Sequence, residues 1–194
     1  MSIDNPICNM LPNAIKAGKS QMSRGISTQK AAKSQADGIL NSINLSDVLE
    51  GIPDLDFTLN TEAINAIKNS CPGQFPDLPS INNQFSLGYG DYLKDLRASP
   101  IGQLDNIAKS LESFMKKISS IPDKLYNYLT CLRAICSLSP EEFQTEWDEI
   151  TSLKNQLDLD ENGSPKILSE SIKGTLDNYN TKVSKITKQI KKFT

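Results

Sequence analysis

The chain has 194 residues, which is enough for one domain or for one domain with an extended arm. Hydrophobic residues make up 38% of it and aromatic residues only 6%, so a core has to be built mainly from isoleucine and leucine, as in slender helical packing. No histidine occurs, which excludes serine–histidine, cysteine–histidine and histidine–metal sites. The net charge of -2 combines alternating basic and acidic blocks, which either pair within and between subunits or form solvated helix faces.

The N-terminal half predicts an irregular organisation. Residues 1–12 carry Pro6 and Pro12 and predict an extended arm. Residues 13–44 predict a weak helix whose many alanine and glycine side chains permit close packing against a partner; the alternative is a basic arm that orders only on assembly. A helix end and a turn are expected within 45–60, and a short helix over 61–70. Residues 71–90 predict a Pro/Gly-rich loop that holds one short strand or hairpin, lies along a neighbouring subunit, or simply crosses over.

The C-terminal half is punctuated by three Ser-Pro pairs. Ser99-Pro100, Ser139-Pro140 and Ser164-Pro165 each place an N-cap hydroxyl before a proline at the first helical position. Glu142 adds the acid of a capping box after Ser139. Pro122 predicts either two helices meeting at a bend, which we favour, or one kinked helix.

Apolar residues at 3-4 spacing form two long stripes in this half, and such stripes are typical of helices buried against other helices. The first comprises Leu104, Ile107, Leu111, Phe114, Ile118, Ile121, Leu125, Tyr128, Leu132 and Ile135. The second comprises Ile172, Leu176, Tyr179, Val183, Ile186, Ile190 and Phe193, on a helix expected from Pro165. A shorter stripe is expected on the helix from Pro140 to about Leu157: Phe143, Trp147, Ile150, Leu153 and Leu157. We interpret the two long stripes as interaction seams.

Four cysteines, Cys8, Cys71, Cys131 and Cys136, are too scattered for a disulfide scaffold and lack the close pairs of a zinc site. We therefore expect buried reduced thiols, with a Cys8–Cys71 disulfide as the alternative in an extracellular particle.

Two further patterns have a functional and a purely structural interpretation. The segment Asp158–Gly163 matches the first half of a calcium loop, but Ser169 stands where a bidentate glutamate is required, which favours an acidic turn. The lysines at 182, 185, 188, 191 and 192 suit nucleic acid or an anionic surface, or simply a helix C-terminus. We therefore predict no metal, no cofactor and no catalytic residues.

The segment Met1–Pro6 lacks a secretory signal, and no apolar stretch is long enough to span a bilayer. The N-terminal sequence MSIDNPIC, the Ser/Asn/Lys/Ile-rich composition and the helical layout resemble structural proteins of tailed bacteriophages, closest in character to the T4-like contractile-tailed group. The resemblance implies a baseplate, tail or neck subunit in several symmetric copies, located in the virion after assembly in the host cytoplasm.

The sequence thus predicts an all-α, elongated helical bundle with coiled-coil-like seams, an extended N-terminal arm and a Pro/Gly-rich central loop. Two regions are expected, residues 1–98 and residues 99–194. The predicted function is that of a non-enzymatic structural or assembly protein whose partners are other structural subunits, with nucleic acid not favoured. The alternative is a cytoplasmic regulatory module that docks a partner helix or binds nucleic acid through its lysine-rich C-terminal helix.

Overall fold

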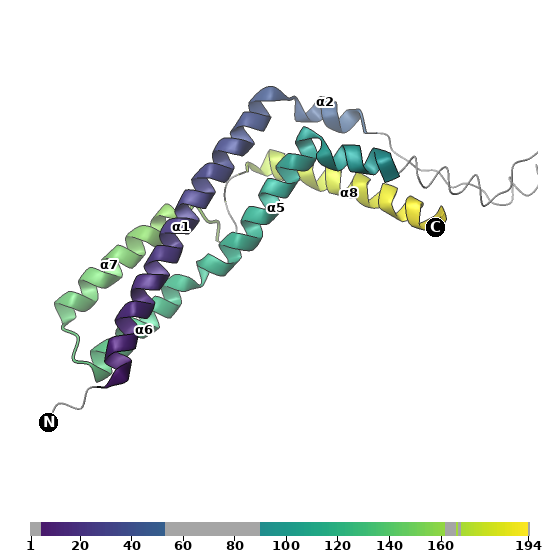
Figure 1. The fold of residues 1–194 in the computed structure, drawn as a ribbon. Helices are drawn as coiled ribbons and strands as arrows, with labels where there is room; N and C mark the ends of the chain where they lie inside the picture. Colours follow the sequence, from purple (N-terminus) through teal and green to yellow (C-terminus); the bar gives the residue numbers. More distant parts are fainter. Residues whose placement is uncertain (1–4, 53–89, 162–165, 167, 194) are drawn as a thin grey trace, which may run out of the picture. The chain divides into compact units, whose positions relative to one another are not determined.

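The computed structural model describes residues 5–52, 90–161, 166 and 168–193, and its regular secondary structure is helical. The helices are α1 (Pro6–Ser42), α2 (Leu45–Glu50), α5 (Pro100–Ser119), α6 (Ile121–Ile135), α7 (Pro140–Gln156) and α8 (Glu170–Phe193), shown in Figure 1. Residues 90–98 are helical as well. The predicted all-α class is confirmed. The helix expected over 61–70 and almost all of the loop expected over 71–90 lie outside the described residues; Gly90 is helical.

The chain divides into two compact units. Unit 1 comprises Met1–Gly38 and Asn106–Ser169, and unit 2 comprises Ile39–Asp105 and Glu170–Thr194. Both units therefore draw on residues before and after position 98, the predicted boundary between the two regions.

Helix α1 begins at Pro6, so the extended arm predicted for residues 1–12 is wrong for residues 6–12. Asn5 caps this start, because its Oδ1 accepts a hydrogen bond from the Ile7 N–H at 3.1 Å. Proline is well suited to the first helical position, where its fixed φ is helical and no N–H is needed. The helix predicted from residue 13 onward is confirmed as far as Ser42.

The predicted Ser-Pro helix start at Ser99 and the predicted break at Pro122 are both confirmed. The N–H of Gly102 donates to Ser99 Oγ at 3.4 Å, at the start of α5. Helices α5 and α6 are separated by Ser120, whose backbone stays near the helical region with φ -86° and ψ -8° and whose side chain makes no capping bond. Because this junction residue is close to helical, the apolar face of α5 continues onto α6.

Helix α7 carries the complete capping box predicted from its sequence. The Glu142 N–H donates to Ser139 Oγ at 3.2 Å, and the Ser139 N–H donates to Glu142 Oε2 at 2.9 Å. The backbone hydrogen bond from Ser139, followed by the bond to its side chain, lowers the pKa of the Glu142 carboxyl below its usual 4.5.

Replacing Ser139 with alanine should destabilise unit 1 by about 0.5–2 kcal/mol, because an N-terminal N–H of α7 loses its acceptor. In the native chain, the bond to the Glu142 carboxylate is present above pH 4.5 and is lost as the pH falls through the lowered folded-state pKa. An NMR titration of the Glu142 carboxyl should show this low pKa, and Ser139→Ala should move it upward. Ser152→Ala, on an exposed interior position of α7, is the control; an equal loss of stability there would contradict the capping role.

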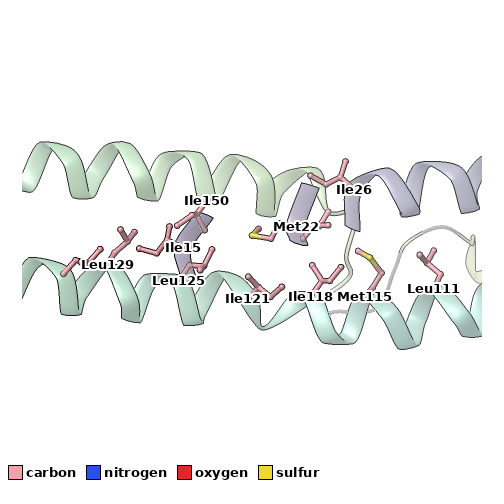
Figure 2. Packing of buried hydrophobic residues seen from close by; sticks show 12 residues of the cluster. Ile15, Met22, Ile26, Leu111, Met115, Ile118, Ile121, Leu125, Leu129 and Ile150 are labelled. Atoms are coloured by element: carbon pink, nitrogen blue, oxygen red, sulfur yellow. The ribbon is translucent and has the colours of Figure 1, made fainter. Parts of the chain in front are cut away.

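The core of unit 1 is formed by α1, the second half of α5, α6 and α7, which face one another in Figure 2. Its buried residues are Ile15, Met22, Ile26, Leu111, Met115, Ile118, Ile121, Leu125, Leu129, Leu132, Ile150 and Leu157. Phe143, Trp147 and Leu153 of α7 are partly buried against it. The stripe predicted on α7 therefore packs on this core, with Ile150 and Leu157 as its buried members.

Helix α1 approaches α5 and α6 closely at two glycines. A Cβ added to Gly18 would lie 2.6 Å from Leu125 Cδ2, and one added to Gly25 would lie 2.6 Å from Ile118 Cδ1. Moving seven residues forward on α1, from Gly18 to Gly25, corresponds to moving seven residues back, from Leu125 to Ile118. Helix α1 therefore packs antiparallel to α5 and α6. The predicted small-residue face has its partner within the same unit.

Gln29 fixes the chain that follows α7 onto α1. The side chain is buried, its Nε2 donates to the Asp158 carbonyl at 3.1 Å, and its Oε1 accepts from the Asp158 N–H at 3.2 Å. The amide therefore satisfies both backbone groups of one residue, as buried polar groups require.

Unit 2 contains α2 and α8 packed on one another, together with residues 90–105. The Tyr179 hydroxyl donates to the Leu96 carbonyl at 3.3 Å, and Asn180 Nδ2 donates to the buried Asp105 carboxylate at 2.7 Å. Burial and then the nearby Asp105 charge raise the pKa of Tyr179, against an opposing effect of Arg97. Helix α8 begins at Glu170, so the predicted start at Pro165 is wrong; Ser164 and Pro165 lie outside the described residues.

Candidate interaction surface

The members of the first predicted seam differ in burial. Leu104, in unit 2, is buried; in unit 1 the buried members are Leu111, Ile118, Ile121, Leu125 and Leu132. Ile107, Phe114 and Tyr128 are partly exposed. Ile135 is 52% exposed in the single chain.

Sequence reasoning missed two fully buried residues of unit 1, Met115 on α5 and Leu129 on α6. Both lie beside the central row formed by Leu111, Ile118, Leu125 and Leu132, on the side opposite Ile107, Phe114, Tyr128 and Ile135. The signal was present, because Met115 and Leu129 also stand at 3-4 spacing from that central row. The buried face of α5 and α6 is therefore centred to one side of the predicted stripe.

The second predicted seam lies on α8 in unit 2. Leu176, Tyr179 and Ile186 are buried, whereas Ile172, Val183 and Ile190 are partly exposed. The side chain of Phe193 lies outside the described residues.

The cysteines differ from the prediction. Cys8 and Cys136 form a disulfide with a Cα–Cα distance of 5.6 Å, so the expectation of reduced thiols is wrong for both. Cys71, the predicted alternative partner of Cys8, lies outside the described residues. Cys131 is a free thiol but is exposed, contrary to the expected burial. The pairing arises because α1 and α6 are antiparallel, which brings the start of α1 to the end of α6.

Three exposed large apolar side chains stand within two residues of a bonded cysteine in the sequence. Ile7 and Met10 of α1 are 44% and 68% exposed, and Ile135 of α6 is 52% exposed. In the sequence, Ile7 immediately precedes Cys8 and Ile135 immediately precedes Cys136. We refer to Ile7, Met10 and Ile135 as the apolar corner of unit 1. The apolar area that these side chains leave exposed can be buried when another molecule binds.

A cavity of about 430 Å³ adjoins the same end of unit 1. It is lined by Pro12, Ile15, Lys16, Lys19, Leu129, Leu132, Leu138 and Glu146. Lys19 Nζ pairs with Glu146 at 2.7 Å and with Glu149 at 2.6 Å, which ties α1 to α7 beside the cavity. Desolvation acts to lower the pKa of Lys19, but the hydrogen bonds and charges of the two glutamates outweigh it and raise the pKa.

Aromatic side chains form a second surface feature of unit 1, on α6 and α7. Tyr126, 44% exposed, meets Trp147 and Phe143 edge to face, with ring centroids 4.8 and 5.8 Å away. The Arg133 guanidinium lies 5.8 Å from the centre of the Phe143 ring. Tyrosine, tryptophan and arginine are the residues that most often dominate binding energy in protein interfaces.

The C-terminal lysines and the calcium-like segment are the two remaining predicted patterns. Lys182 Nζ donates to the Ile52 carbonyl at 2.7 Å, while Lys185, Lys188 and Lys191 are exposed on α8. Residues 162 and 163 of the calcium-like segment lie outside the described residues. Where the chain is described, it holds no group of three or more cysteine, aspartate or glutamate side chains placed to bind a metal ion. The same residues include no helix long and apolar enough to cross a membrane.

Comparisons with known proteins do not assign the chain to a family. No protein-family model matches the chain, and neither a curated protein nor a solved structure matches it.

Proposed function

We propose that this protein is a non-enzymatic structural or assembly component that acts through helix packing and contacts with other subunits, among them further copies of itself. We place it in a virion, as part of the baseplate or tail of a contractile-tailed bacteriophage, on the strength of the resemblance carried by MSIDNPIC, the composition and the helical layout. In the assembled form, its helices form an elongated bundle with coiled-coil-like seams.

The observation that carries the assembly function is the apolar corner. Ile7, Met10 and Ile135 would each contribute apolar area on association, and burying such area is the main driving force for it. The corner lies on two helices whose ends are joined by a disulfide, which limits the ordering entropy lost when a partner binds. The partly exposed Tyr126, Phe143 and Trp147 supply a second contact surface on the same unit.

Light scattering of the purified, oxidised full-length chain over a range of concentrations tests this function. We expect a defined multiple of the 21.4 kDa chain mass, and a return toward a single chain when Met10 and Ile135 are both replaced by glutamate. The matched control places the same two charges at Asn127 and Asn155, exposed polar positions of α6 and α7, and should leave the mass unchanged. A single-chain mass at every concentration would contradict the proposal.

A further inference from the structure

The Cys8–Cys136 disulfide joins two elements that are far apart in the sequence but meet in unit 1. Cys8 is the third residue of α1, and Cys136 is the C-cap of α6, 128 residues later. The bond therefore fixes the start of α1 to the end of α6.

Few other contacts hold the first turns of α1. None of residues 6–14 is buried, and only Leu11 among them packs against the core, as a partly buried neighbour. The first buried residue of α1 is Ile15, which is 3% exposed. Buried residues then recur along the helix at Gly18, Met22, Gly25 and Ile26. The anchored part of α1 thus begins at Ile15.

The backbone of the same segment is also weakly stabilised. Pro12 lies inside the helix and has no N–H, so the Cys8 carbonyl cannot receive the usual helical hydrogen bond from position 12. The first turn contains no acidic residue to interact favourably with the helix dipole. Residues 6–14 therefore depend on the disulfide more than the rest of α1 does.

We infer that Cys8–Cys136 is a thiol-sensitive clamp: reduction releases residues 6–14 from unit 1, while α1 from Ile15 onward stays packed. A dithiol reductant supplies two electrons and two protons to the protein sulfurs, the S–S bond breaks to give two thiols, and the reductant becomes a cyclic disulfide. Pro12 then leaves the wall of the 430 Å³ cavity, which exposes Leu132 and Leu138. The inference concerns the isolated chain and does not depend on the proposed function.

Hydrogen exchange followed by mass spectrometry, on the full-length chain with and without dithiothreitol, tests the clamp. Reduction should speed amide exchange of residues 9–14 by about tenfold or more, while exchange over residues 15–30 changes much less. Cys8→Ser should give the same pattern without reductant, and Cys131→Ser, which removes the exposed free thiol, should behave as the native chain. Circular dichroism confirms that each variant is folded.

Two exchange results would overturn the clamp. One is unchanged exchange of residues 9–14 after both sulfurs are shown by mass to be reduced. The other is an equal loss of protection along the whole of α1, which would make the disulfide a general structural bond rather than a local clamp. Free thiols at Cys8 and Cys136 in the chain purified without reductant would also contradict the clamp.

Discussion

Replacing Leu125 with alanine is expected to lower the free energy of unfolding of unit 1 by about 2–5 kcal/mol. The side chain is 1% exposed and lies in the centre of the core, directly beneath Gly18 of α1. Its loss removes apolar contacts and leaves a cavity between helices that the disulfide holds in place, so collapse around the site is limited. Urea denaturation followed by fluorescence of Trp147 measures this loss, because Trp147 is the only tryptophan and packs against the same core.

Ile135→Ala is the matched control for this experiment. It removes a side chain from the same helix and the same predicted seam, but from a position that is 52% exposed. We expect a change within about 0.5 kcal/mol. Equal losses for the two variants would mean that the buried face of α6 is centred differently from the face described here.

Replacing Gly18 or Gly25 with valine is expected to destabilise unit 1 by about 1–3 kcal/mol each, because the new side chain has no room between α1 and the helices beneath it. At either glycine, even a Cβ would lie only 2.6 Å from an aliphatic carbon, of Leu125 or of Ile118. The helix propensity gained on replacing glycine with valine is only a few tenths of a kcal/mol and does not offset this overlap. Thermal and urea denaturation of each variant provide the measurement.

Gly38 provides the control on the same helix. It is exposed and nothing lies within 4 Å of an added Cβ, so Gly38→Ala should raise stability by up to about 1 kcal/mol through helix propensity alone. If Gly18→Val and Gly25→Val were also stabilising, the close approach of α1 to α5 and α6 would be wrong.

Local sequence signals predicted the starts of α5 and α7 and the break between α5 and α6, but not the start of α8. Ser139 and Glu142 satisfy each other's backbone groups, and Pro122 marks the junction of α5 and α6. Such signals are reliable because capping and proline geometry involve residues only a few positions apart. The arm predicted around Pro6 is wrong because proline is equally suited to the first turn of a helix, and α1 begins there.

The candidate interaction surface was much less predictable, because it depends on contacts between distant segments. A stripe at 3-4 spacing defines an apolar face, but whether Met115 or Ile107 is the one buried beside Leu111 depends on where α1 and α7 pack. The Cys8–Cys136 pairing likewise follows from the antiparallel course of α1 and α6, which no spacing of cysteines in the sequence reveals. The exposure of Ile135 is a consequence of its place at the end of that packing.

The packing of Gly18 on Leu125 and of Gly25 on Ile118 leaves an ambiguity that the apolar residues alone do not resolve. If α1 slipped by seven residues, Gly18 would stand opposite Ile118 and Gly25 opposite Leu111, again pairing glycine with a branched aliphatic side chain. The slip would carry Cys8 about 10 Å along the helix axis from Cys136, too far for a disulfide. Oxidation of these two cysteines therefore selects one alignment of α1 from several that the repeating pattern allows, and chains paired out of alignment would be recognisable by their free thiols.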